Sequence, residues 1–181
     1  MTKIEAFFLK IKAWQFILLL CIPYFFTRVA VSIGVNDRQV LIVYCVIDAV
    51  FYAWLWILGN KLNNQVPKKI RVNSGFFRFC IFFSFAFVLY SILVEAGFGL
   101  IIPNFIDFFF LFCMIYVSYF VAKNLTMAEK YKIAGFLEIY ILILLVFGWP
   151  IGIWFIQPRV NKLFKEKKVE GVERKGSGLY S

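Results

Sequence analysis

The sequence predicts an all-α, polytopic transmembrane helical bundle, and three observations support that fold class. Hydrophobic residues make up 62% of the 181 residues, against about 45–50% in soluble domains. Lipid leaves only helices or closed barrels as spanning structures, and the apolar runs lack the polar alternation of barrel strands. Five apolar blocks each approach the ~20 residues that a helix needs to cross a bilayer, at residues 13–35, 40–58, 76–94, 105–122 and 133–156. We expect four spanning helices in two hairpins and a fifth, broken helix.

A short basic segment, residues 1–12, precedes the first block. Its apolar side chains recur at helical spacing, and Thr2 and Glu5 stand at the positions of a capping box. This pattern predicts an amphipathic helix over residues 3–12 on the membrane surface, with a frayed basic leader as the alternative. Arg28 interrupts the first block before its small-residue stretch, so we expect a retained helix rather than a cleaved signal peptide.

The distribution of lysine and arginine orients the blocks. These residues gather before the first block, between the second and third, and between the fourth and fifth, whereas the two other connections hold few of them. Basic loops stay in the cytoplasm. We therefore expect a cytoplasmic N-terminus, with blocks one and two, and likewise three and four, forming hairpins.

The fifth block is broken at Gly148-Trp149-Pro150. Proline removes a backbone donor and glycine adds freedom, so the helix must kink or stop there. Residues 133–147 would extend about 22 Å at ~1.5 Å per residue, too short to span comfortably. A re-entrant helix would return the chain to the cytoplasm, whereas a kinked full crossing would leave the following residues outside. We favour the re-entrant form.

The membrane domain is then expected at residues 13–158, followed by a basic, partly flexible cytoplasmic tail at residues 159–181. Anionic lipid headgroups attract lysine and arginine close to a membrane surface. The predicted headgroup contacts of the tail are Arg159, Lys162, Lys165, Lys167 and Lys168.

Charged residues inside or bordering the blocks are the candidates for chemistry, because a charge in lipid is costly unless it is paired or hydrated. Helical spacing extends most of them into one polar stripe on each of the first four blocks, which predicts four faces turned toward a common interior. In block order, the stripes are Tyr24, Arg28 and Ser32; Tyr44, Asp48 and Tyr52; Ser84, Ser91 and Glu95; and Asp107 and Ser118. Arg28 and Asp48 are expected at one depth, Glu95 and Asp107 at another, and Glu138 near the headgroups. They form either a proton or cation path or a polar pocket, or else interhelical contacts, which we favour.

Several chemistries are excluded. The chain has no histidine, so Ser-His triads and histidine-bearing zinc or haem sites are absent. The four cysteines fall one per block without metal-ligand spacing, and no nucleotide-binding fingerprint occurs. We expect no enzyme activity, no cofactor and no metal. The net charge of +10 flanks the blocks without interleaved stacking aromatics, which argues against a nucleic-acid partner.

Two functions fit this pattern. We favour a non-enzymatic subunit or accessory protein of a membrane complex, or a homo-oligomer. The alternative is a small channel, transporter or membrane-permeabilising effector that uses Arg28, Asp48, Glu95 and Asp107.

Two segments carry a resemblance. Residues 119–125, with the sequence Tyr-Phe-Val-Ala-Lys-Asn-Leu, and residues 150–161, which end in Gln157-Pro158-Arg159-Val160-Asn161, are similar to the C-terminal part of a family of small multi-pass membrane proteins of Bacteroidota-type bacteria. The resemblance covers about the last third of the chain. It implies a bacterial source, and with it a place in the bacterial cytoplasmic (inner) membrane, and it carries no catalytic or binding residue across.

Overall fold

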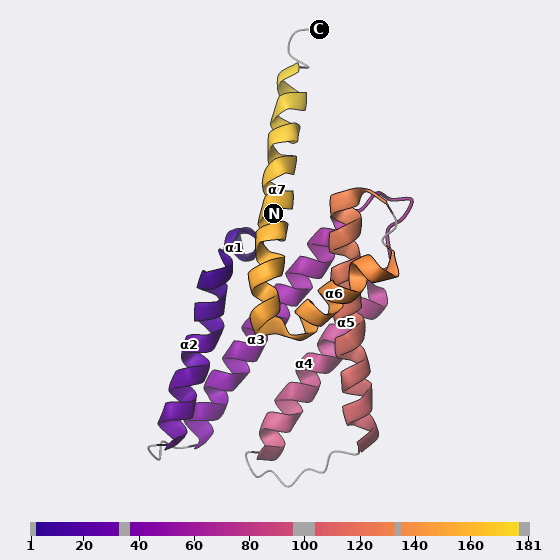
Figure 1. Cartoon of the computed structure of the whole chain (residues 1–181). Helices are drawn as coiled ribbons and strands as arrows, with labels where there is room; N and C mark the ends of the chain where they lie inside the picture. Colours follow the sequence, from indigo (N-terminus) through magenta and orange to yellow (C-terminus); the bar gives the residue numbers. More distant parts are fainter. Residues whose placement is uncertain (1–2, 33–36, 96–103, 133–134, 178–181) are drawn as a thin grey trace.

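The computed structural model describes residues 3–32, 37–95, 104–132 and 135–177 (Figure 1). These residues form seven helices and no strand, which confirms the all-α prediction. The helices are α1 (Lys3–Lys10), α2 (Ala13–Ser32), α3 (Asp37–Gln65), α4 (Gly75–Glu95), α5 (Asn104–Lys130), α6 (Phe136–Phe147) and α7 (Trp149–Ser177).

Within the described residues, three helical stretches are long and apolar enough to cross a membrane. They are Val40–Gln65 in α3, Gly75–Val94 in α4 and Phe105–Lys130 in α5. Helices α1 and α2 together make a fourth stretch of this kind only as a bent pair, because they meet at an angle of 101°. The three stretches coincide with the second, third and fourth apolar blocks of the sequence.

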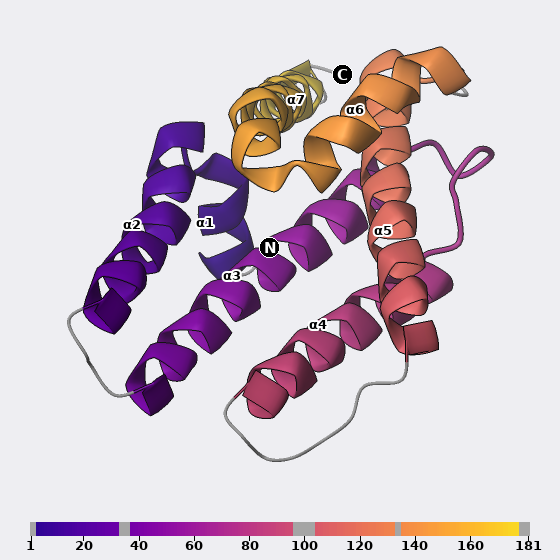
Figure 2. The same cartoon turned by 60° about the horizontal axis from the view of Figure 1, so that its bottom comes forward.

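Helix α3 is central to the bundle. It contacts α2 on one side and α4 and α5 on the other, and α4 and α5 contact each other. Figure 2 shows α2 and α3 side by side, with α7 viewed nearly along its axis next to α6. The main core gathers buried side chains from all seven helices, with Val146 as the contribution of α6.

A close approach of α3 and α4 shapes this core. The rings of Phe77 in α4 and Phe120 in α5 stack with their centroids 4.2 Å apart. Phe77 also rests on the backbone of α3, because a Cβ atom added to Gly59 would lie 2.2 Å from its Cζ atom. Small residues allow helices in lipid to approach in this way. Gly59 is therefore required by packing.

The basic N-terminal segment contains the predicted helix, α1, and residues 11–12 form the bend that leads into α2. Its apolar side chains differ in burial. Phe8 and Leu9 are buried in the main core, whereas Ile4 and Phe7 are 65% and 53% exposed. The difference arises because α1 packs against both α3 and α7, which gives it a covered side and an open side.

The fifth block breaks where the sequence predicted. Helix α6 ends at Phe147, Gly148 follows with φ −82° and ψ 54°, and α7 begins one residue later. Pro150 then stands in the first turn of α7, where its missing N–H costs no helical hydrogen bond. The turn is tight, since a Cβ atom added to Gly152 would lie 1.5 Å from the carbonyl oxygen of Leu145.

Helix α7 turns back after this break. Figure 1 shows α6 running obliquely into the bundle and α7 returning toward the end where α5 finishes and α1 lies. Ile139 and Leu142 of α6 pack with Ala122 of α5, while Ile153 and Ile156 of α7 join the main core. The fifth block therefore forms two helices, α6 and α7, with the break at Gly148.

The polar stripes do not meet in a common interior, so that expectation is wrong for the described residues. In this part of the chain, α2 contacts α3 and α7 but neither α4 nor α5, because α3 lies between them. The Tyr24 and Tyr44 rings, 5.7 Å apart, lie between α2 and α3. Tyr52 instead faces α5, where its hydroxyl donates to Met114 Sδ at 3.7 Å. The stripes are divided between separate interfaces.

Candidate functional site

A buried polar cluster centred on Gln157 joins α7 to α1 and α3. The Gln157 side chain is fully buried. Its Oε1 atom accepts a hydrogen bond from Trp54 Nε1 at 3.1 Å. Its Nε2 group donates to the backbone carbonyls of Phe8 at 2.9 Å and Ile11 at 3.2 Å, and to Asn161 Oδ1 at 3.3 Å. Asn161 Nδ2 donates a further bond to the Ile11 carbonyl at 3.2 Å.

The bend after α1 explains why these carbonyls need partners. The last carbonyl oxygens of a helix have no backbone N–H donor within that helix, so caps or water normally satisfy them. The chain turns by 101° between α1 and α2, so α2 does not continue the hydrogen-bond ladder of α1. Gln157 and Asn161, one helical turn apart on α7, supply the missing donors. They cap α1 from another helix.

The chemistry of tryptophan fixes the orientation of the Gln157 amide. An indole N–H can only donate, so the oxygen of the amide must face Trp54 and the NH₂ group must face the carbonyls. The opposite orientation would set two donors against each other and two acceptors against each other. Each polar atom of the Gln157 side chain thus has a matched partner.

Two ion pairs tie the same region together. Arg159 of α7 forms a two-point contact with Glu129 of α5, in which Nε lies 2.9 Å from Oε1 and Nη2 bonds Oε2. The Nζ atom of Lys61 in α3 lies 2.9 Å from Oε2 of Glu5 in α1. The Gln157 cluster and the ion pairs together link α7 to α1, α3 and α5.

Among the described residues, the charged candidates inside the apolar blocks do not lie together in one group. Asp48 is half-buried on α3. Asp107 is exposed in the first turn of α5, where the positive end of the helix dipole favours a carboxylate. The side chains of Arg28, Glu95 and Glu138 lie outside the described residues, so their expected pairings stay predictions.

Two serine hydroxyls of the stripes bond to their own helix. Ser91 donates to the Phe87 carbonyl at 3.0 Å and Ser118 to the Met114 carbonyl at 2.9 Å. Ser84 is fully buried, and its hydroxyl has no hydrogen-bond partner among the described residues. A hydrogen bond to the same helix, as Ser91 and Ser118 make, satisfies a polar side chain inside an apolar interface without a water-filled path.

The predicted headgroup contacts fall on α7. Arg159 is engaged by Glu129 and its side chain remains 39% exposed. Lys162 and Lys165 are exposed. The side chains of Lys167 and Lys168 lie outside the described residues. Contact of these residues with lipid stays a prediction.

Sequence reasoning did not assign a role to Gln157, although the element around it was distinctive. Two signals were present. Gln157 is an amide that directly follows the last apolar block, and Asn161 stands four residues later on the same helical face. The partners themselves, Trp54 and two backbone carbonyls near residue 10, are remote in sequence and leave no local pattern.

No metal-binding group of three or more Cys, Asp or Glu side chains occurs within the described ranges. None of the protein-family models, curated proteins or solved structures compared with this chain matches it. The resemblance of residues 119–125 and 150–161 to a bacterial multi-pass family therefore stays a prediction.

Proposed function

We propose that this chain is a non-enzymatic integral membrane protein of the bacterial cytoplasmic membrane that acts as a subunit or accessory protein of a membrane complex, or as a homo-oligomer. Helices α2, α3, α4 and α5 cross the bilayer in two hairpins. Helices α6 and α7 form a re-entrant hairpin, and both chain ends lie in the cytoplasm.

The positions of the basic side chains support this orientation. Lys61, Arg78 and Arg159 belong to the regions that the charge bias assigns to the cytoplasm, and all three have protein partners there. Arg78 also lies over the Trp56 ring, 5.6 Å from its centroid, as in an aromatic belt. The outward faces of α6 and α7 are apolar, with Leu137 81% and Ile151 68% exposed, which suits contact with lipid chains.

The observation that carries the proposal is the use of buried polar groups for packing. The amide of Gln157 bonds to α3 through its oxygen and to α1 through its NH₂ group. The stripe hydroxyls of Ser91 and Ser118 bond to their own helices. A conducting path needs polar groups that face a shared hydrated space. Groups that are already bonded between or within helices support a packing role instead.

The test measures both the assembly state of the protein and the ion flux that it supports. The native protein is extracted with its surrounding lipid, and its mass and stoichiometry are measured. It is then reconstituted into vesicles for proton and potassium flux. We expect an assembly of fixed stoichiometry, and flux no greater than that of empty vesicles.

Asp48→Asn removes the half-buried carboxylate and Asp107→Asn the exposed one, and both belong to the path of the alternative function. Asp37→Asn, outside that path, serves as the matched control. We expect none of these variants to alter flux. Flux that is lost in Asp48→Asn or Asp107→Asn but kept in Asp37→Asn would establish the channel or transporter alternative. A lone monomer without partner would refute the subunit proposal.

A further inference from the structure

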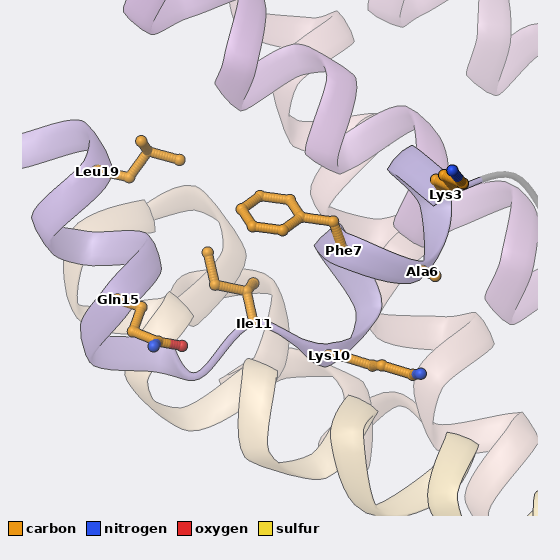
Figure 3. A pocket seen from close by; sticks show the side chains of 7 residues that line it. All are labelled: Lys3, Ala6, Phe7, Lys10, Ile11, Gln15 and Leu19. Carbon is orange, nitrogen blue, oxygen red and sulfur yellow. The ribbon is translucent and has the colours of Figure 1, made fainter.

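An open hollow lies in the bend between α1 and α2. Its volume is about 540 Å³, within the ~300–1,000 Å³ typical of small-molecule sites. Figure 3 shows Phe7 of α1 reaching toward Leu19 of α2, with Ile11 between them at the bend. Lys3 and Lys10 lie along the α1 edge. The hollow thus has an apolar wall and a basic edge.

Helical spacing explains this division. Lys3, Phe7 and Lys10 stand at i, i+4 and i+7, so they share one side of α1. That side is the open one, since the opposite side packs on α3 and α7. Leu19 is 42% exposed and Phe7 is 53% exposed, so the wall presents apolar surface outward.

The charge around the hollow is positive. Glu5, the acidic residue of α1, turns toward α3 and pairs with Lys61 at 2.9 Å. Gln15 lines the hollow from α2, and its Oε1 atom accepts the backbone N–H of Lys12 at 3.0 Å. That bond directs the carbonyl of Gln15 to the backbone and leaves its NH₂ group as a donor. Two ammonium groups and an amide donor suit an anion.

We propose that this hollow binds one anionic phospholipid. The headgroup phosphate lies between Lys3 and Lys10, and one acyl chain follows Phe7, Ile11 and Leu19 along α2. A free anion would not cover the apolar wall, and a neutral lipid would not use the lysines. The 101° bend sets α1 across the axis of α2, which places the lysines at headgroup level when α2 crosses the bilayer. The inference rests on the proposed membrane insertion.

Lipid binding to the purified full-length protein is measured by native mass spectrometry in detergent. The probes are phosphatidylglycerol, phosphatidylcholine with the same chains, and inorganic phosphate. We expect one tightly bound phosphatidylglycerol and weaker binding of phosphatidylcholine. Inorganic phosphate should not compete with phosphatidylglycerol for the site. Equal binding of both lipids, or displacement by phosphate alone, would overturn the proposal.

The double variant Lys3→Gln/Lys10→Gln should weaken phosphatidylglycerol binding by about 20- to 30-fold, since a lysine near an anionic surface is worth roughly fivefold. Lys68→Gln/Lys69→Gln removes the same charge from an exposed segment and should change binding little. An equal loss in both double variants would refute the site. Lys3→Arg/Lys10→Arg should retain binding, which separates loss of charge from misfolding.

The apolar wall has its own control. Phe7→Ala should weaken the binding of both phosphatidylglycerol and phosphatidylcholine. Phe108→Ala, at a 74% exposed position on α5, should weaken the binding of neither lipid. Equal effects of these two variants would contradict the proposed path of the acyl chain. Alkaline carbonate extraction of the membranes tests insertion separately, so an inserted protein without selective lipid binding refutes this site and not the proposed function.

Discussion

Gln157 accepts a hydrogen bond from the indole N–H of Trp54 at 3.1 Å, which joins α7 to α3 across 103 residues of sequence. An apolar hairpin alone can slide along a bundle, because one apolar contact substitutes for another. A buried amide with matched donors and acceptors fits at one position only. The bond therefore fixes how far α7 returns after the break at Gly148.

Gln157→Leu should destabilise the protein strongly. The leucine fills the space but leaves the Trp54 N–H and the carbonyls of Phe8 and Ile11 without this partner, at about 1–3 kcal/mol for each buried group left unsatisfied. Thermal unfolding in detergent measures the loss. Gln15→Leu, at an exposed amide, is the matched control and should shift the midpoint little.

The contact between Arg159 and Glu129 should contribute modestly. Both side chains are partly exposed, at 39% and 24%, so solvent screens the pair and about 1 kcal/mol is expected. A double-mutant cycle with Arg159→Gln and Glu129→Gln measures the coupling free energy of unfolding. Strictly additive effects would show that the two side chains do not stabilise the α5–α7 contact together.

Gly152→Ala should prevent the α6–α7 turn from closing. The new Cβ atom would lie 1.5 Å from the Leu145 carbonyl oxygen, which is backbone and cannot rotate away. We expect a loss above about 3 kcal/mol, or no folded protein, by circular dichroism and gel filtration. Gly135→Ala is the matched control, because nothing lies within 4 Å of its added Cβ atom. Normal stability of Gly152→Ala would refute the described turn.

Gly59→Ala should separate α3 from α4 through Phe77. The clash, at 2.2 Å from Phe77 Cζ, involves a side chain, so a cost of about 1–3 kcal/mol is expected. Phe77→Leu shortens the opposing side chain and should recover part of the loss in the double variant. If the two substitutions were additive, the close approach at Gly59 would not exist.

The sequence predicted the features that depend on local chemistry. The all-α class, three of the spanning stretches and the break at Gly148 follow from segment length, glycine and proline. The pairing of elements was less predictable. The polar stripes were expected to meet, but Tyr24 and Tyr52 face different helices, because spacing gives the face of a helix and not its neighbour.

The candidate site shows the same limit. Gln157 belongs to the distinctive segment that follows the last apolar block, yet its partners on α1 and α3 are set by the 101° bend and by the return of α7. The break itself left both a re-entrant helix and a kinked span open. The choice between them depends on contacts between distant segments, which no local pattern contains.

Accessibility of residue 167 tests the central claim, the return of α7 to the side where the chain begins. Lys167→Cys is made in a background in which the four native cysteines are alanine, beside Lys69→Cys for the cytoplasmic side and Asp37→Cys for the outer side. A membrane-impermeant maleimide should label Asp37→Cys in intact cells, and Lys167→Cys and Lys69→Cys only after the membranes are opened. Labelling of Lys167→Cys in intact cells would contradict the re-entrant hairpin.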